Sequence, residues 1–477
     1  MKKQFLSVAL LLCIYSVIFI YHSFIFAANI DTIQILPLHN YKQNVANYID
    51  ESSNDFNIPL IQASILDAKT KDFKEHLMGS LSPWAEIFVT NTVKDSHPHE
   101  ILQKNFLKFR EHCDTPLAKS FAVNFKAYPC SWFDNTVSKN INFPQFVQQE
   151  YNSKRRAIAV NNTSARLFPT YEPLFYNHKI AGNGYPFDQL QDSSIWIGSP
   201  LYVIGNSLNG WSLVLTHTKL MTWIPTSDIA FVTEKFIKNY MSQVNTNGLR
   251  VIVQTEVNIN SEYEKNQTLT VGYIGSIFPG KNKSENIILL PIKLKEGNAK
   301  LIAATVNING VSSFPLTSTP ANFLRVIKEL NGRSYGWGGL YFNNDCSQEL
   351  QSIFTVFGIW LPRNSVDQYK IGKIIDLSNL KTEQRIQELS RIGRKLVTLV
   401  YIPGHIMLYV GNIQGSPWVY NNIWALRPED NSYRSIIGQA AFLPLLNSYM
   451  IDDSKLISLA DEHKRTKFIL SFLDEMN

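Results

Sequence analysis

This chain of 477 residues has few charged residues and no strong excess of either sign. Charged residues make up 18% and hydrophobic residues 45%, a balance that is typical of globular proteins and excludes extensive disorder. The net charge of +6 permits an anionic polymer as a partner but does not require one. No basic stripe with interleaved aromatic residues points to nucleic acid. The length predicts roughly three or four domains.

The N-terminus has the pattern of an export signal. Two lysines follow Met1, residues 5–26 are almost wholly apolar, and Ala27 and Ala28 supply small residues at a cleavage point. We therefore expect residues 1–28 to be a signal peptide and the protein to be periplasmic or extracellular. The apolar run is long for a signal peptide, so an uncleaved membrane anchor is the alternative.

Cysteine is scarce, with four in the whole chain. Removal of the leader leaves Cys113, Cys130 and Cys346, so an exported protein has either one disulfide and one free thiol or three free thiols. Cys113 and Cys130 are close in sequence and are the natural pair. Cys346 is the odd cysteine, and its presence in an oxidising compartment needs an explanation.

The residue patterns typical of helices, strands and turns divide the mature chain into four parts. Residues 29–150 predict a helical and irregular region, with helices expected near 41–55 and 58–76. Short β-type runs separated by turn signals predict two small β modules, at 151–245 and 246–312. In residues 313–477 helices come first and an antiparallel sheet follows, which is an α+β pattern. Residues 450–477 are expected to form an added helix.

The strongest chemical signal surrounds Cys346. Three glycines in four positions, 336, 338 and 339, allow tight backbone turning and close approach of a substrate. Cys346 then stands at the start of an amphipathic helix predicted over residues 347–357. The positive end of a helix favours a thiolate, which is the reactive form of cysteine. This pattern predicts a cysteine nucleophile.

A cysteine nucleophile needs a base, and His405 is the best candidate. It follows a Pro-Gly turn and begins an apolar strand that would hold the imidazole rigidly, whereas His463 lies in a charged tail. A third polar group should orient the imidazole. Asn421 is our first choice for that position and Asn422 the second.

Three motifs in the last third of the chain, taken together, match a known family. They are Tyr335-x-Trp-Gly-Gly339, Asp345-Cys-Ser347, and Gly404-His405 followed by a strand that ends at Gly411. They resemble the NlpC/P60 cysteine peptidases, and the wider context resembles the branch with a helical N-terminal stabilising domain and two bacterial SH3-like domains. Residues 313–477 would then be the catalytic domain.

The resemblance implies a papain-like α+β catalytic domain that needs no cofactor or metal. Such enzymes use a Cys-His-Asn thiol mechanism to hydrolyse the bond between γ-linked D-glutamate and a diamino acid in peptidoglycan peptides. Partners would be murein peptides or fragments, and a membrane only if the leader stays uncleaved. Carried over by motif position, the catalytic residues are Cys346, His405 and Asn421; Tyr335 and Asp345 bind the substrate amine, and Ser347 and Ser365 its D-glutamyl carboxylate.

Two departures from the family pattern keep alternatives open. Gln348 replaces a common glycine, and the third catalytic position, often histidine, is asparagine here. The alternatives are a catalytically weak or inactive cell-wall-binding protein, and an amidase or acyltransferase on the same fold. In the branch the first barrel often narrows the cleft, for which Tyr171 and Tyr202 are candidate lining residues.

Overall fold

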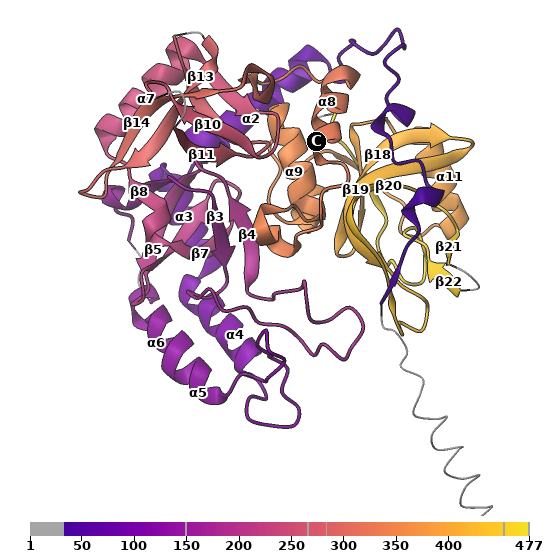
Figure 1. Cartoon of the computed structure of the whole chain (residues 1–477), viewed down its shortest axis with the longest axis horizontal. Coiled ribbons are helices and arrows are strands. Elements are labelled where there is room, and N and C mark those ends of the chain that lie inside the picture. Colours follow the sequence, from indigo (N-terminus) through magenta and orange to yellow (C-terminus); the bar gives the residue numbers. More distant parts are fainter. Residues whose placement is uncertain (1–32, 148–149, 265–266, 283, 452–453, 476–477) are drawn as a thin grey trace, which may run out of the picture.

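The computed structural model describes residues 33–475, except 148–149, 265–266, 283 and 452–453. The expected leader, residues 1–28, lies outside the described residues. Within the described part, no helix is long and apolar enough to cross a bilayer. Strands of the described residues form three seven-stranded sheets and one two-stranded hairpin, and the helices lie between and beside them, giving a mixed α+β architecture (Figure 1).

The N-terminal region is helical but begins later than expected. Its helices are α2 (Ala63–Met78), α3 (Glu86–Ser96), α4 (Pro98–Arg110), α5 (Cys130–Trp132) and α6 (Ser138–Ile141). The helix expected near 41–55 is wrong, because that segment holds only the short 3-10 turn Val45–Asn47. Cys113 and Cys130 form a disulfide, so the free cysteine of the described residues is Cys346. The apolar faces of α3 and α4 pack on the first sheet.

The first sheet has the order β4-β3-β7-β6-β5-β2-β8. Its strands are β2 (Arg156–Ala159), β3 (Thr163–Arg166), β4 (Gln191–Ile195), β5 (Pro200–Asn206), β6 (Trp211–Thr216), β7 (Met221–Pro225) and β8 (Ile229–Phe231). The Asn209-Gly210 turn signal lies between the paired strands β5 and β6, with Gly210 at a φ of 86°. Nearly every residue of β5 and β6 is buried, so both faces of this sheet are covered.

The second sheet follows a helix absent from our sequence expectations, α7 (Glu234–Asn247), which buries Phe236, Tyr240 and Val244. The sheet order is β11-β10-β14-β13-β12-β9-β15. Its strands are β9 (Leu249–Ile252), β10 (Val257–Ser261), β11 (Thr268–Gly272), β12 (Ile277–Lys281), β13 (Ser284–Lys293), β14 (Ala299–Val306) and β15 (Val311–Phe314). Because α7 runs across residue 245, the limit between the two predicted β modules stays a prediction, as do the other domain limits.

The C-terminal part begins with α8 (Pro320–Leu330), capped by Thr319 and started by a proline. The order of its sheet is β1-β20-β19-β18-β17-β23-β16. The elements are β1 (Ile33–Ile35), α9 (Cys346–Val356), α10 (Ser365–Gln368), β16 (Lys373–Asp376), α11 (Thr382–Ile392), β17 (Thr398–Ile402), β18 (His405–Ile413), β19 (Ser416–Leu426), β20 (Arg434–Pro444), β21 (Ser448–Ile451), β22 (Ser454–Ile457) and β23 (Ile469–Phe472).

The helix expected at 450–477 is wrong, because this segment forms strands. β21 and β22 make a hairpin, and β23 enters the sheet between β17 and β16. The loop before β23 is held by the fully buried Arg385, which donates to the backbone carbonyls of Ala460, Asp461 and Arg465. These partners are far apart in sequence, so local patterning gave no sign of them.

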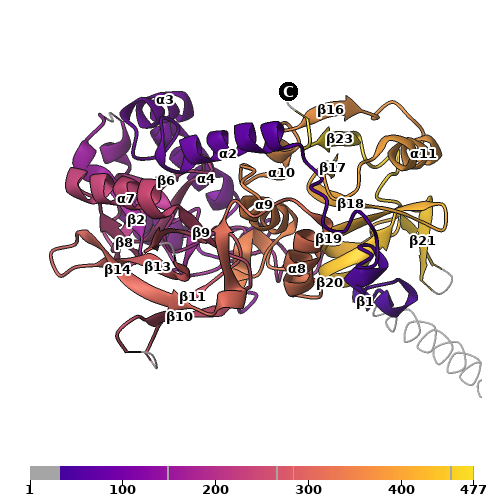
Figure 2. The same cartoon turned by 90° about the horizontal axis from the view of Figure 1, so that it is seen from above.

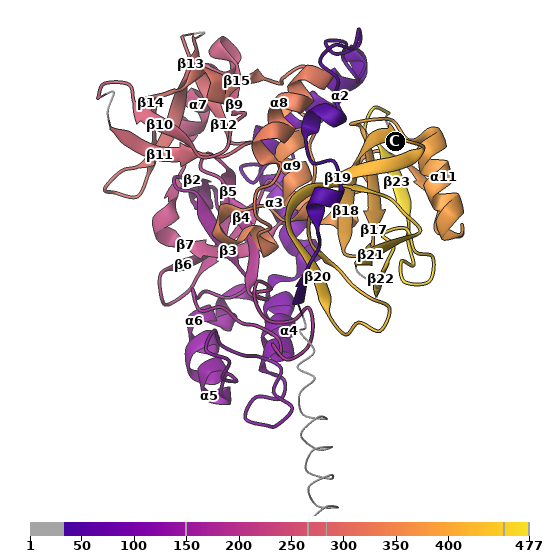
Figure 3. The same cartoon turned by 45° about the vertical axis from the view of Figure 1, so that its right-hand side comes forward.

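One hydrophobic cluster joins the two halves of the molecule. It includes Phe73 of α2, Val251 of the second sheet, Phe323 of α8 and Phe354 of α9. Figures 2 and 3 show α2 crossing the top of the junction and α9 lying between the first two sheets and the C-terminal sheet. Because burial of a large apolar side chain contributes roughly 1.5–3 kcal/mol, this shared cluster holds α9 firmly in place.

Candidate active site

Cys346 is the first residue of α9, and Asp345 caps this helix. The Asp345 side chain accepts a hydrogen bond from the backbone N–H of Gln348 at 2.9 Å, which satisfies one of the free N–H groups of the first turn. The Cys346 side chain is 9% exposed. The backbone N–H of Ile406 lies against its sulfur, so the thiol faces the start of β18.

The glycine-rich turn before α9 adopts the backbone that its glycines permit. Gly338 and Gly339 have φ values of 57° and 78°, in the left-handed region that favours glycine. A Cβ on Gly339 would lie 2.3 Å from the Ser194 Oγ atom. The turn therefore brings the backbone directly against the first sheet, and Gly338 donates its N–H to Asp345 at 3.2 Å.

His405 begins β18, as predicted, and its ring is hydrogen-bonded to the side chain of Asn421. The distance from His405 Nε2 to Asn421 Oδ1 is 2.8 Å. The Asn421 amide is itself oriented, because its Nδ2 donates to the Ala441 carbonyl at 3.2 Å. This hydrogen bond engages Nε2 and leaves Nδ1 for exchange of a proton. The structure thus brings His405 and Asn421 into direct contact and sets the Cys346 sulfur against the backbone of Ile406, the residue that follows His405.

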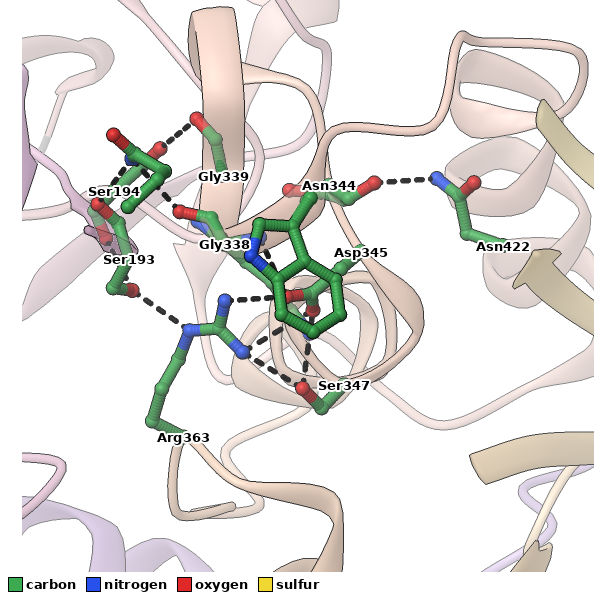
Figure 4. Close-up of polar contacts among 12 residues, drawn as sticks. Ser193, Ser194, Gly338, Gly339, Asn344, Asp345, Ser347, Arg363 and Asn422 are labelled. Carbon is green, nitrogen blue, oxygen red and sulfur yellow. Dashed lines mark hydrogen bonds and ion pairs between the residues drawn. The ribbon is translucent and has the colours of Figure 1, made fainter. Parts of the chain in front are cut away.

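Asn422 points to the opposite face of β19, as successive residues of a strand do. Its Nδ2 donates to the Asn344 carbonyl at 2.9 Å (Figure 4). Its neighbour Glu349 is buried, and burial raises the pKa of that carboxyl to about 7. Tyr420 and Asn344 also donate to Glu349. This buried cluster of Asn422, Glu349, Tyr420 and Asn344 stabilises the segment that leads to Cys346. It does not contact His405.

The free thiol and imidazole are both held in their neutral forms. Burial, reinforced by the charge of Asp345, raises the pKa of Cys346 to about 12, against the opposing N–H groups of Ile406 and Ser347. Burial lowers the pKa of His405 to about 4, although its hydrogen bond to Asn421 acts the other way. The N-terminus of α9 alone would favour a thiolate at Cys346. Burial raises the pKa of this thiol more strongly than the helix lowers it, so the thiol stays protonated.

Arg363, which our sequence reasoning did not assign to the site, neutralises Asp345. Its Nη2 donates to Asp345 Oδ2 at 2.6 Å and its Nη1 to Ser347 Oγ at 2.7 Å (Figure 4). Its charge holds the pKa of Asp345 below its usual range despite burial. The signal available in the sequence was an arginine two residues before Ser365, inside an otherwise apolar segment.

The first sheet contacts this cluster directly. Arg363 Nε donates to Ser193 Oγ at 2.7 Å, and Ser194 Oγ donates to the Gly339 carbonyl at 2.7 Å (Figure 4). Gln191 Nε2 donates to the Gly338 carbonyl at 2.9 Å. Strand β4 therefore forms hydrogen bonds both with the glycine-rich turn that precedes Cys346 and with Arg363, the arginine that binds Asp345.

Aromatic side chains gather around Tyr335 and the glycine-rich turn. Tyr335 is partly exposed, and its ring centroid lies 6.0 Å from that of Trp424. Phe187, from the first β module, packs edge-on against Trp337 at 5.1 Å. Ser365 is partly exposed at the start of α10.

The two tyrosines named earlier as candidate lining residues contact other parts of the chain. Tyr171 packs on Trp211, and Tyr202 is buried against Tyr151. The prediction that Tyr202 lines the cleft is therefore wrong, whereas for Tyr171, whose side chain is exposed, it stays a prediction. Among the described residues the grouping suited to a metal is Cys113, Asp114 and Cys130, whose two sulfurs are joined in the disulfide.

Comparison with known proteins finds two family models that match parts of the chain. Residues 332–415 match the NlpC/P60 family, and residues 173–225 match an SH3 domain of the SH3b1 type. The structure is similar to a solved NlpC/P60 endopeptidase from Photobacterium damselae subsp. piscicida, with 26% identity and a TM-score of 0.77, over 94% of this chain and 100% of that one. An NlpC/P60 family protein from Bacillus cereus ATCC 10987 has 15% identity and a TM-score of 0.40, over 63% and 98%. No curated protein matches the chain.

Proposed function

We propose that this chain, an NlpC/P60 peptidase with an SH3 domain, hydrolyses the bond between γ-D-glutamate and a diamino acid in peptidoglycan peptides. The observation that carries the proposal is the Cys346 thiol held against the Ile406 N–H, next to a His405 ring oriented by Asn421. An exported protein, released by cleavage within residues 1–28, would meet this substrate outside the cytoplasm.

The chemistry begins from a neutral pair. His405 Nδ1 accepts the thiol proton as Cys346 sulfur attacks the γ-glutamyl carbonyl carbon. The C–N bond then breaks, the amine of the diamino acid leaves with the proton from His405, and a thioester remains on Cys346. Water, deprotonated by His405, attacks the thioester and releases the glutamyl product and the thiol. Backbone N–H groups of the first turn of α9, which lack partners within the helix, stabilise the oxyanion.

Substrate binding in this proposal uses the groups around the helix start. Ser365 donates to the glutamyl carboxylate. Ser347, whose hydroxyl donates to Asp345 and accepts from Arg363 in the free protein, binds the same carboxylate by turning its proton from Asp345 to the substrate. Tyr335 and Asp345 bind the free amine. Because Asp345 already accepts from Arg363, Ser347, Gln348 and Gly338, Tyr335 makes the direct contact and Asp345 contributes charge from behind.

The decisive experiment incubates purified protein with L-Ala-γ-D-Glu-diaminopimelate and identifies the products by mass spectrometry. Cys346→Ala should lower kcat by about three orders of magnitude or more, with an unchanged circular dichroism spectrum. Full activity in the variant would overturn the proposal. Lack of any product with the parent protein would favour a wall-binding role, and release of products from intact sacculi but not from free peptides would favour an amidase.

A further inference from the structure

Two segments reach beyond the edge of the C-terminal sheet at which His405 stands. β23 pairs with β17 so that Ile469 is opposite Tyr401, and the residues just before Ile469 therefore pass the turn that leads into His405. β19 continues past the start of β18 to Leu426, which places Arg427 at the same edge. The loop before β23 contributes Arg465.

Arg465 and Arg427 lie close enough to repel one another. Burial and the charge of Arg427 lower the pKa of Arg465, against a weaker opposite effect of Asp461. The Arg465 Nε atom is shielded from solvent and has no hydrogen-bond partner among the described residues. Arg427 donates to the neutral side chain of Asn431 at 3.0 Å.

Among the described residues, Arg465 is the arginine with a shielded nitrogen that lacks a partner, whereas Arg385 and Arg434, which also have no carboxylate partner, donate to backbone carbonyls. Arg394 pairs with Asp474 at 2.7 Å and Arg363 with Asp345 at 2.6 Å. Within the described part of the chain, neither Arg427 nor Arg465 forms an ion pair with a carboxylate. A shielded guanidinium nitrogen without a partner destabilises the fold unless a ligand compensates it, so Arg465 indicates a ligand with negative charge.

The charge of Arg465 also reaches His405, since it is among the influences that lower the pKa of that imidazole. The group that protonates the leaving amine must touch it. The leaving half of the substrate therefore lies on the His405 side of Cys346, whereas Tyr335, Ser347 and Arg363 surround the other side. The register of β23 with β17 places Arg465 near the edge of the sheet at which His405, the proton donor to the leaving amine in the proposed mechanism, stands.

We infer that Arg465, together with Arg427, forms a subsite that binds a carboxylate of the leaving half of the substrate. The inference rests on the proposed function, in which the leaving half is a diamino acid. Two carboxylates of that half have the required chemistry: the one on the side chain of diaminopimelate and the one at the peptide C-terminus. A guanidinium binds either in the same bidentate manner.

The test compares three peptides: L-Ala-γ-D-Glu-diaminopimelate, its side-chain carboxamide and its C-terminal carboxamide. With the parent protein, amidation of the bound carboxylate should raise KM about tenfold, and amidation of the other should leave KM unchanged. Arg465→Gln should raise KM for the unmodified peptide about tenfold with kcat nearly constant, and should abolish the difference between the peptides. The matched control is Lys464→Gln, since Lys464 is an exposed neighbour paired with Glu429.

A binding measurement separates failure of this inference from failure of the proposed function. In the Cys346→Ala background, calorimetry should show about tenfold weaker binding of the unmodified peptide after Arg465→Gln. Arg427→Gln replaces Arg465→Gln if the latter does not fold. Equal KM for the three peptides with the parent protein, or unchanged KM and affinity in a folded Arg465→Gln variant, would overturn the subsite. Absence of cleavage and of binding by the parent would instead reject the proposed function.

Discussion

At the residue scale, the proposed mechanism requires the neutral thiol of Cys346 and the neutral imidazole of His405 to exchange a proton. The raised pKa of Cys346 and the lowered pKa of His405 both follow from burial. A base that starts neutral depends on geometry, because the proton transfer requires Nδ1 to point at the sulfur. The hydrogen bond from His405 Nε2 to Asn421 is the contact that sets this orientation.

Two neighbouring asparagines allow a matched test of that role. Asn421→Ala should lower kcat about tenfold to a hundredfold, because the imidazole loses its orienting partner. Asn422→Ala removes a buried hydrogen bond to the Asn344 carbonyl instead, which should lower the free energy of unfolding by about 1–3 kcal/mol with kcat almost unchanged. Steady-state kinetics and urea unfolding of both variants measure the two effects. The opposite pattern would assign the orienting role to Asn422.

At the element scale, the local signals of the sequence were accurate where one segment determines its own structure. The glycine-rich turn and the amphipathic run predicted α9. The charged segment after residue 450 was misread as a helix because its strands pair with β16 and β17, which lie far away in the sequence. Such pairing overrides local propensity.

The turn before α9 provides a prediction at this scale. Gly339→Ala should destabilise the fold by about 3 kcal/mol or more, because the new Cβ meets both Ser194 Oγ and the Ser194 backbone N, at 2.3 and 2.6 Å. Gly415→Ala is the matched control: Gly415 has a φ of 80° with nothing within 4 Å. It should lose only about 1 kcal/mol through backbone strain. Thermal unfolding of the two variants separates the effect of the steric contact with Ser194 from that of backbone strain. Equal losses of stability in both variants would show that β4 moves to accommodate the extra methyl group.

At the scale of the whole molecule, local patterns in the sequence were enough to propose site residues but not to predict the contacts between the parts of the site. Cys346, His405 and Asn421 were accessible because each has a local signature. Arg363 and Ser193 were not, because their hydrogen bond joins residues 170 positions apart. The same applies to the packing of α2 on the C-terminal part, where the His76 ring meets Trp360 edge-on with centroids 3.7 Å apart.

This junction makes the fold sensitive to acid. Burial, aided by His217 and Lys219, lowers the pKa of His76 to about 3, and burial lowers that of His217 to about 4. Below pH 6.5 the unfolded chain binds protons at these positions and the folded protein does not. The contribution of these two histidines to the free energy of unfolding is therefore fully present above pH 6.5. It is lost as the pH falls towards their pKa values in the folded protein.

His76→Phe isolates the contribution of one of these groups, because a phenylalanine ring keeps the edge-on packing against Trp360 but cannot bind a proton. Between pH 6 and pH 4 the parent should lose about 1.4 kcal/mol per pH unit more than the variant, and the two should differ little in their pH response above pH 7. Urea unfolding at several pH values measures this slope. His463→Gln serves as control, because His463 is 81% exposed and its removal should leave the slope unchanged. Equal slopes in His76→Phe and the parent would show that the junction already accommodates a charged imidazole, and acid sensitivity would then belong to the carboxylates.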